Sequence, residues 1–355
     1  MFEDLLRTWD GEEVVVRFDA PTGAWMFIAV HSSVLGPAMG GTRMKSYAEP
    51  ADGLRDVMRL SAAMTSKMAM AEVPLGGGKA VLAVAEIPDG APRRELMLRY
   101  GDLVESLHGT YWTACDMNTS SADMDVIAER ASTVFGRTEA AGGSGTSAPD
   151  TAIGVFHGVR ATVAHAFGSD ALTGRRVTIQ GVGAVGEPLA RRLAQAGARL
   201  TLSDVDEPRA KELAHELDCE TVSAEDVLEV ECDVFAPCAT GGVLSGETIP
   251  RLRCRAIAGA ANNQLGEPED ADRLSDRGIL YAPDYIVNAG GVIHLAGFEL
   301  LHEDRARVDQ RLRRVADTLG EVFRVADERG ISTGAAADAI VQDRLAAGRK
   351  ERHDA

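Results

Sequence analysis

The sequence has few of the residue patterns that would tie it to a metal ion or a disulfide framework. Its five cysteines form no C-x-x-C pair, and its eight histidines include no H-E-x-x-H motif. The usual ligand spacing of a structural or catalytic zinc site is therefore missing. An odd number of scattered cysteines is typical of a reduced protein, so we expect a cytoplasmic location and no metal.

Positive charge is also scarce. The chain has 37 Lys and Arg against 54 Asp and Glu, a formal net charge of −17. It lacks the basic stripe that neutralises phosphates, so neither nucleic acid nor an anionic membrane is an expected partner. No apolar run approaches the length of a membrane span, and Met1–Arg7 has acids where an export signal has bases.

The chain of 355 residues is long enough for two domains, each with its own core. In the first half, Glu13–Phe18 and Ala24–His31 predict a β-hairpin, and Ala51–Met70 has the apolar spacing of a helix. The small, polar segment 136–147 marks the predicted domain boundary.

Two stretches of the first half are rich in glycine. Leu35–Arg43 predicts a loop, and Ser66–Val81 holds Lys67 and Lys79 on either side of Gly76–Gly78. Glycines permit positive φ and close approach of a ligand, so we expect Lys79, at the start of an apolar strand over Lys79–Ala85, in a crowded, partly dehydrated place. Desolvation and a second cation would both lower its pKa and make it a general base. A solvated loop and a phosphate cradle are the alternatives.

An acidic residue follows the next apolar run. Tyr111–Thr119 predicts a strand that runs into a loop, with Asp116 at the carboxyl end of the strand. Ligands bind at this edge of open α/β sheets. An acid there can also be simply solvated, or can cap the following helix.

The second half carries the strongest local signal. Arg176–Gln180 predicts a buried strand, Gly181–Gly186 reads G-x-G-x-x-G, and Asp204 follows a second strand. In this context the glycines make a tight turn, admit a pyrophosphate and let the helix pack on the strand. The carboxylate of Asp204 can accept both ribose hydroxyls and would repel a 2′-phosphate, which favours NAD over NADP.

Three more apolar runs continue the predicted parallel sheet, within 232–242, 256–264 and 278–288. Asn262 and Asn263 follow the second run and could hydrogen-bond a carboxylate or an amide, although asparagine pairs commonly form turns. Residues 303–329 and 333–350 predict two charged helices.

These motifs, together and in this order, resemble the amino acid dehydrogenases of the glutamate, leucine, phenylalanine and valine group, most closely the phenylalanine members. The resemblance covers nearly the whole length. It rests on Leu35–Arg43, Met64–Lys67, Pro74–Lys79, Asp116–Thr119, Ser121–Met124, Gly181–Gly186, Gly259–Asn263 and Asn288–Gly291.

The resemblance implies an α/β protein of two domains with a cleft between them. The N-terminal domain would hold a mixed sheet, and the C-terminal domain a Rossmann-like, doubly wound parallel sheet. Residues 1–137 would bind substrate and form a homo-oligomer, 138–328 would bind NAD, and 329–355 would form a helix packing back on the first domain.

The resemblance also implies NAD-dependent, reversible oxidative deamination of an L-amino acid to a 2-oxo acid and ammonia. Lys79 would be the general base, Asp116 would shuttle a proton at the amino group, and Lys67 would pair with the substrate carboxylate. The other substrate-binding residues would be Gly40, Met64, Ala114, Asn263, Val292 and Leu295. The cofactor-binding residues would be Thr151, Gly181, Gly183, Ala184, Val185, Gly186, Asp204, Cys238, Ala239 and Asn262.

Two pocket residues give opposite indications about the substrate. Leu295 matches the pocket leucine of phenylalanine enzymes, whereas Ala114 stands where those enzymes tend to have glycine. One methyl group in an apolar pocket changes discrimination by about 10 to 200-fold. We predict phenylalanine, with leucine or valine as the alternative.

Two functions outside this family remain open. A 2-hydroxy acid dehydrogenase would need a histidine beside an arginine, and Arg43 has no obvious histidine partner. A non-catalytic NAD sensor would keep the glycine turn but need not keep Lys67, Lys79 or Asp116.

Overall fold

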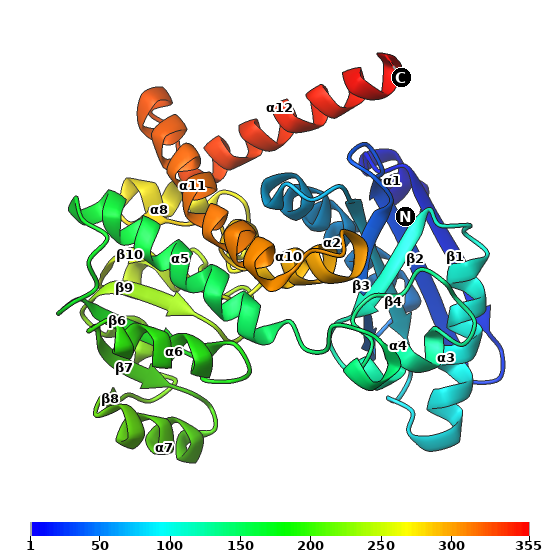
Figure 1. Cartoon of the computed structure of the whole chain (residues 1–355), viewed down its shortest axis with the longest axis horizontal. Coiled ribbons are helices and arrows are strands. Elements are labelled where there is room, and N and C mark those ends of the chain that lie inside the picture. The colour runs from blue at the N-terminus through cyan, green and yellow to red at the C-terminus, as the bar shows by residue number, and fades with distance from the viewer. Residues whose placement is uncertain (1, 355) are drawn as a thin grey trace. The chain divides into compact units, whose positions relative to one another are not determined.

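The computed structural model describes residues 2–354, which form two compact units (Figure 1). Unit 1 comprises residues 2–146, 295–302 and 343–354, and unit 2 comprises 147–294 and 303–342. The predicted functional domains 1–137, 138–328 and 329–355 concern what each part binds, and they stay a prediction.

Unit 1 is built on a five-stranded mixed sheet in the order β1-β2-β4-β3-β5. The predicted hairpin is confirmed, because β1 pairs antiparallel with β2. β2 is also antiparallel to β4, whereas β3 runs parallel to both β4 and β5. The strands are β1 Glu13–Asp19, β2 Ala24–Ser32, β3 Ala38–Lys45, β4 Gly76–Ala83 and β5 Tyr111–Cys115.

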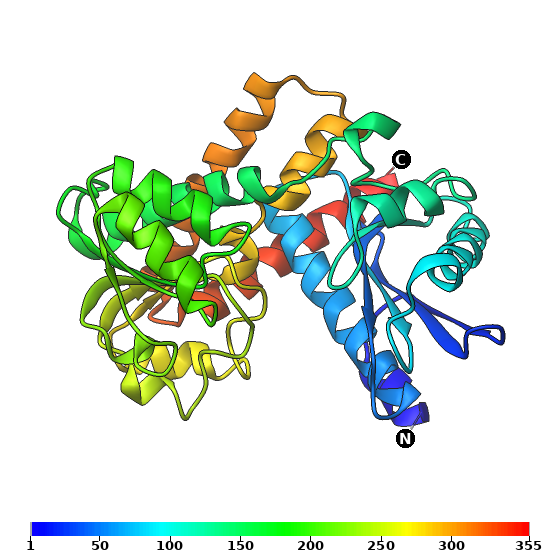
Figure 2. The same ribbon diagram turned by 90° about the horizontal axis from the view of Figure 1, so that it is seen from below.

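Helices cover both faces of this sheet. Figure 2 shows α2 (light blue) on one side and α3 and α4 (cyan to teal) on the other. Leu54 and Val57 of α2 pack against Phe27 and Val81, whereas Leu96 of α3 belongs to the core of the opposite face. The helices are α1 Phe2–Thr8, α2 Pro50–Ala71, α3 Gly90–Glu105 and α4 Ser121–Ile127.

The predicted loop at Leu35–Arg43 is wrong, because most of it is the strand β3. Ala38–Lys45 lies between β4 and β5 in the sheet. Its glycines and methionines gave no β signal, but its two parallel neighbours supply hydrogen bonds and burial that override local propensity.

The glycines before Lys79 are also in a strand rather than a loop. Gly76–Gly78 open β4, and all three are buried. None has a positive φ. A Cβ on Gly77 would lie 2.0 Å from Oγ1 of Thr65 in α2, and one on Gly78 would lie 2.9 Å from the ring of Tyr111. These glycines therefore make room for protein neighbours, not for a ligand as the sequence suggested.

Unit 2 is built on a six-stranded sheet in which all pairs are parallel, in the order β11-β10-β9-β6-β7-β8. The chain enters this sheet at β6, in its middle, and adds β7 and β8 toward one edge. It then returns to β9 on the other side of β6, so the winding direction reverses between β6 and β9. This confirms the predicted doubly wound, Rossmann-like sheet. The strands are β6 Arg176–Gln180, β7 Arg199–Ser203, β8 Glu220–Thr221, β9 Cys232–Pro237, β10 Cys254–Ile257 and β11 Leu280–Tyr281.

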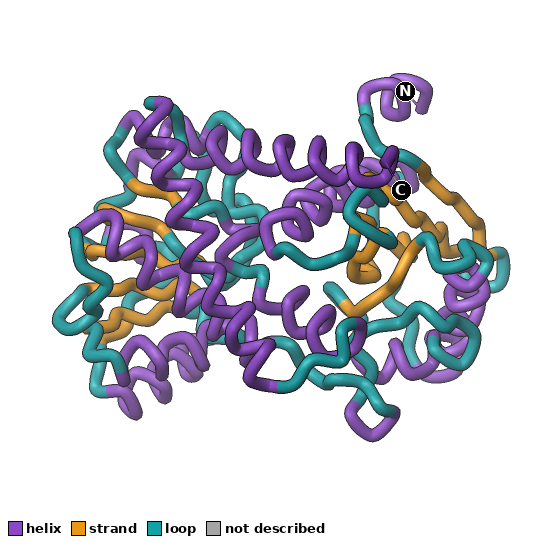
Figure 3. Tube along the Cα trace, turned by 45° about the horizontal axis from the view of Figure 1, so that its top comes forward, coloured by secondary structure: helices purple, strands orange, loops and turns teal. Residues whose placement is uncertain are grey.

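The remaining helices are α5 Ala148–Phe167, α6 Gly186–Gln195, α7 Glu207–Leu217, α8 Asp270–Asp276, α9 Asp284–Val287, α10 Gly290–Leu295, α11 Arg305–Arg329 and α12 Thr333–Asp354. The helices α5 to α8 are interspersed with the strands of unit 2, whereas α9 to α12, within residues 284–354, follow the last strand without another strand between them. Figure 3 shows the helices, strands and loops in separate colours. Within residues 2–354, no helix is both long and apolar enough to cross a lipid bilayer.

Candidate active site

The register of the mixed sheet brings together two of the predicted functional residues of unit 1. Lys79 is the fourth residue of β4, and Asp116 directly follows β5. The Nζ atom of Lys79 lies 3.0 Å from Oδ2 of Asp116, and the lysine side chain is only 7% exposed. The two residues thus form a largely buried ion pair on the face of the sheet that α2 covers.

Arg43 also contacts Asp116, and the sequence analysis did not identify it as a site residue. Its Nε atom donates to Oδ2 of Asp116 at 3.2 Å, and its Nη1 atom donates to Oδ2 of Asp56 at 3.0 Å. Tyr47 donates its hydroxyl to the same Asp56 oxygen at 2.7 Å. Only the placement of β3 between β4 and β5 reveals this network. Successive side chains of a strand point to opposite faces of the sheet, so the strand assignment fixes the face on which Arg43 lies.

The charges around Asp116 determine its protonation state. Burial alone would raise the pKa of its carboxyl group, but the positive charges of Lys79 and Arg43 and their hydrogen bonds hold the pKa below its usual value. Asp56 behaves in the same way: burial opposes ionisation, and contacts with Tyr47, Arg59 and Arg43 outweigh it. Both carboxyl groups are therefore ionised at neutral pH.

The predicted pocket residues of the sheet differ in where they point. Ala114 shares a face with Asp116 by strand alternation and is buried. Gly40 alternates to the opposite face, where a Cβ would lie 1.9 Å from the carbonyl oxygen of Gly78. Met39, not Gly40, has its buried side chain on the face of Lys79.

The other predicted substrate residues come from helices. Met64 and Lys67 lie in α2, on either side of Thr65, which borders Gly77 of β4. Leu295 ends α10 and lies near Gly136, where a Cβ would be 3.7 Å from its Cδ2 atom. Val292 belongs to the part of α10 that lies in unit 2.

The glycine turn of unit 2 has the geometry that a dinucleotide requires. Gly181 has φ +93°, and a Cβ on Gly186 would lie 1.9 Å from the carbonyl oxygen of Gly181. A Cβ on Gly183 would meet nothing within 4 Å. The first and third glycines are thus required by the protein's own packing, whereas the second leaves open space above the turn.

Asp204 is fixed beside this turn. Its Oδ2 accepts a hydrogen bond from the amide of Val182 at 2.8 Å, and its Oδ1 accepts one from the amide of Asp206 at 2.9 Å. A pocket of about 230 Å³ opens at Asp204 and is also lined by Glu207 and Lys211. Because a carboxylate can accept about four hydrogen bonds, both oxygens remain able to accept from a ribose. The residues present therefore fit a dinucleotide cofactor.

Two further predicted cofactor residues, Cys238 and Ala239, follow β9 next to the glycine turn. The Cys238 amide donates to the carbonyl oxygen of Gln180 at 2.7 Å, and a Cβ on Gly181 would lie 2.8 Å from that of Ala239. Burial raises the pKa of the Cys238 thiol to about 12. The Cys238 side chain is thus uncharged and packs beside the turn.

The predicted asparagines lie in the loop after β10. Asn288 donates its side-chain amide to Oδ1 of Asn262 at 3.1 Å and so orients it. Asn263 has φ +53°, and its amide donates to Oδ2 of Asp284 at 2.7 Å. Thr151, in the first turn of α5, donates its hydroxyl to the carbonyl oxygen of Ser147 at 3.0 Å.

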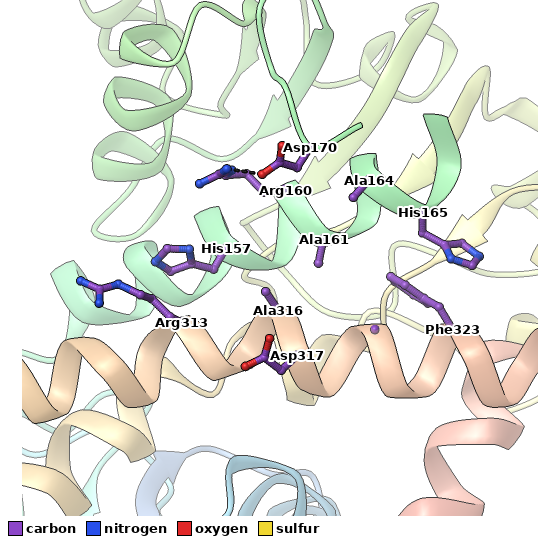
Figure 4. A pocket seen from close by; sticks show the side chains of 11 residues that line it. His157, Arg160, Ala161, Ala164, His165, Asp170, Arg313, Ala316, Asp317 and Phe323 are labelled. Atoms are coloured by element: carbon purple, nitrogen blue, oxygen red, sulfur yellow. Dashed lines mark hydrogen bonds and ion pairs between the residues drawn. The ribbon is translucent and has the colours of Figure 1, made fainter. Parts of the chain in front are cut away.

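A larger cavity of unit 2 lies elsewhere. An open pocket of about 510 Å³ lies between α5 and α11. Its lining includes His157, Arg160, Arg313 and Phe323 (Figure 4). Its lining shares no residue with the predicted substrate and cofactor sites. Within the described part of the chain, no three His, Cys, Asp or Glu residues are grouped as metal ligands would be.

Comparison with known proteins identifies the family. The dimerisation domain of the Glu/Leu/Phe/Val dehydrogenases matches residues 15–133, and the Glutamate/Leucine/Phenylalanine/Valine dehydrogenase domain matches residues 203–352. The chain belongs to the Glu/Leu/Phe/Val dehydrogenase family. As a member of this family it is an amino acid dehydrogenase, an oxidoreductase that acts on the CH–NH2 group.

Similar proteins of this family cover nearly the whole chain. A leucine dehydrogenase of Geobacillus stearothermophilus is 41% identical over 351 residues, which are 98% of this chain and 94% of the relative. A phenylalanine dehydrogenase of Caldalkalibacillus thermarum is 42% identical over 339 residues, 94% of this chain and 91% of the relative. The crystal structure of L-tryptophan dehydrogenase from Nostoc punctiforme matches with a TM-score of 0.84 at 36% identity and covers 99% of this chain and 100% of that one.

Proposed function

We propose that this dehydrogenase catalyses the NAD-dependent, reversible oxidative deamination of an apolar L-amino acid, phenylalanine first, to the 2-oxo acid and ammonia. The observation that carries the proposal is the buried Lys79–Asp116 pair, with 3.0 Å between Nζ and Oδ2. A lysine that exchanges protons with a neighbouring carboxylate can act first as a base and then as an acid toward groups bonded to the reacting carbon atom.

Three residues of unit 1 have separate tasks in this reaction. Lys67 pairs its ammonium group with the substrate carboxylate, since a charge-assisted hydrogen bond fixes the position of Cα. Asp116 accepts a proton from the substrate nitrogen. Lys79, when neutral, takes a proton from the water that attacks the imine carbon and then releases it to solvent. As the carbinolamine collapses, Asp116 gives its proton to the nitrogen, the C–N bond breaks to release ammonia, and Lys79 takes the hydroxyl proton as the C=O bond forms.

The cofactor is held by unit 2 in this proposal. The amides of Gly183, Ala184, Val185 and Gly186 would face the pyrophosphate, and Asp204 would hold the ribose. When bound, NAD⁺ supplies the acceptor for the hydride of Cα. The choice of NAD over NADP is supported by the carboxylate of Asp204, because its negative charge would repel a 2′-phosphate.

The choice of phenylalanine is supported by Leu295, which resembles the pocket leucine of phenylalanine enzymes and lies next to Gly136. Leucine or valine is the second candidate. It is supported by the buried methyl group of Ala114 and by the buried Met39 side chain, which occupy the face of Lys79. Extra methyl groups there disfavour a large ring.

Two further properties are part of the proposal. The match to a dimerisation domain supports assembly of identical chains through unit 1. A cytoplasmic location is supported by the five cysteines, all of which are free thiols.

The test is NADH formation from a panel of L-amino acids at alkaline pH, with NAD and with NADP. We expect the highest kcat/KM with phenylalanine and NAD. A highest value with leucine or valine would select the second candidate. No turnover of Phe, Leu, Val, Ile, Tyr or Trp would refute the proposed substrate class.

A further inference from the structure

Arg43 is more deeply engaged in the site than a surface arginine would be. Its guanidinium group lies between two carboxylates, with Nε on Asp116 and Nη1 on Asp56. Its side chain is only 14% exposed. Burying a guanidinium group in this way is costly unless its charge is matched, so its two acidic partners account for its position.

Asp56 in turn fixes the orientation of the Arg43 side chain. Its Oδ2 accepts from Tyr47 as well as from Arg43, and its Oδ1 accepts from Nη2 of Arg59 at 2.9 Å. Asp56 lies in α2, Tyr47 in the segment between β3 and α2. The helix that covers the sheet therefore supplies a fixed anchor behind the arginine.

We propose that Arg43 is a positioning residue of the deamination reaction, which holds the Asp116 carboxylate beside Lys79 and keeps it ionised while Lys79 gives up its proton. The inference rests on the roles of Lys79 and Asp116 in the proposed function.

The reason lies in the difference between the two cations that contact Asp116. In the proposed cycle, Lys79 is neutral for part of the time, and its attraction for the carboxylate is then lost. An arginine side chain stays charged at every accessible pH. Arg43 is thus the constant counter-charge that prevents Asp116 from becoming a buried, unpaired carboxylate.

The tyrosines and the cysteine near Asp116 do not provide this charge. On β5, burial raises the pKa of both Tyr111 and Cys115, and the negative charge of Asp116 adds to the effect. Burial and Asp56 likewise raise the pKa of Tyr47. The charged and titratable groups around Asp116 include Arg43 on β3, Lys79 on β4, Cys115 and Tyr111 on β5, Asp56 on α2, Tyr47, and Glu299 beyond Cys115.

The test compares Arg43→Met with Arg59→Met in the full-length protein. Both substitutions remove one positive charge that contacts Asp56, but Arg59 is exposed and does not contact Asp116. We expect the pKa of the Asp116 carboxyl group to rise by about 1 to 3 units in Arg43→Met, since an adjacent cation lowers the pKa of an aspartate by that amount. In Arg59→Met the pKa of Asp116 should stay unchanged.

The readout of this pKa does not depend on turnover. The side-chain carboxyl carbon of Asp116, labelled with 13C and assigned with Asp116→Asn, should titrate at higher pH in Arg43→Met than in the wild type. Arg43→Lys keeps the charge but not the contacts of one guanidinium group with two carboxylates. In this variant Asp116 should therefore titrate at a pH between its values in the wild type and in Arg43→Met.

The outcomes separate this inference from the proposed function. An unmoved Asp116 titration in both Arg43 variants would overturn the inference, even if the wild type deaminates phenylalanine. Loss of kcat in Arg43→Met without a shift of the Asp116 titration would make Arg43 a merely structural residue. A wild type that forms no NADH would instead refute the proposed function, and the carboxyl titration would still decide whether Arg43 sets the ionisation of Asp116.

Discussion

The chain contains two glycine-rich stretches that look alike in sequence and differ in what their glycines do. In Gly76–Gly78 of β4, added Cβ atoms would collide with α2 and with neighbouring strands. In Gly181–Gly186, the middle glycine Gly183 would meet no protein atom within 4 Å. The first stretch therefore serves packing of the protein on itself, and the second leaves space for a ligand. Composition alone cannot separate these two uses of glycine.

The largest effect on stability is expected at Gly77. A Cβ in Gly77→Ala would lie 2.0 Å from Oγ1 and 2.2 Å from the backbone nitrogen of Thr65, so α2 must shift. Overpacking of this kind costs about 1–3 kcal/mol in the free energy of unfolding. Urea denaturation measures it, with Gly183→Ala as the matched control. Equal free energies of unfolding for the two variants would contradict the claim that the first stretch serves packing and the second leaves open space.

A smaller and different effect is expected at Gly183. Its neighbourhood is open, so Gly183→Val should leave the free energy of unfolding nearly unchanged and obstruct the approach of the pyrophosphate. We expect the Kd for NAD, measured by calorimetry, to rise about tenfold, equivalent to about 1.4 kcal/mol. Unchanged NAD affinity would show that the open space above the turn is not used by the cofactor.

The same comparison explains which parts of the structure the sequence could predict. The strand-turn-helix at Gly181–Gly186 was predictable because it is local, with both strands and the acid Asp204 within 30 residues of the turn. The role of β3 was not, because Ala38–Lys45 becomes a strand only between partners 38 and 73 residues later in the chain.

The candidate site follows the same rule. Lys79 and Asp116 stood out by residue type and by their places next to predicted strands, and the structure brings them to 3.0 Å. Arg43 lay within a stretch predicted to be a loop, so nothing indicated which way its side chain pointed. Gly40 was predicted to line the pocket, but strand alternation assigns that face to Met39.

The central claim is that the Lys79–Asp116 pair is the reacting centre and that the glycine turn binds the cofactor independently of it. Lys79→Ala tests this claim most directly, because Arg43 still pairs with Asp116 in that variant. Lys350→Ala, on the exposed surface of α12, is the charge-matched control.

The measurement is NADH formation from phenylalanine, leucine and valine, together with NAD binding by the same protein samples. We expect kcat to fall by about 10²–10⁴-fold in Lys79→Ala, the usual contribution of a general base. NAD affinity should stay within roughly twofold of that of the wild type, since it depends on the other glycine stretch and not on Lys79. Substantial turnover by Lys79→Ala, at more than roughly a tenth of the wild-type rate, would contradict the assignment of Lys79 as the base.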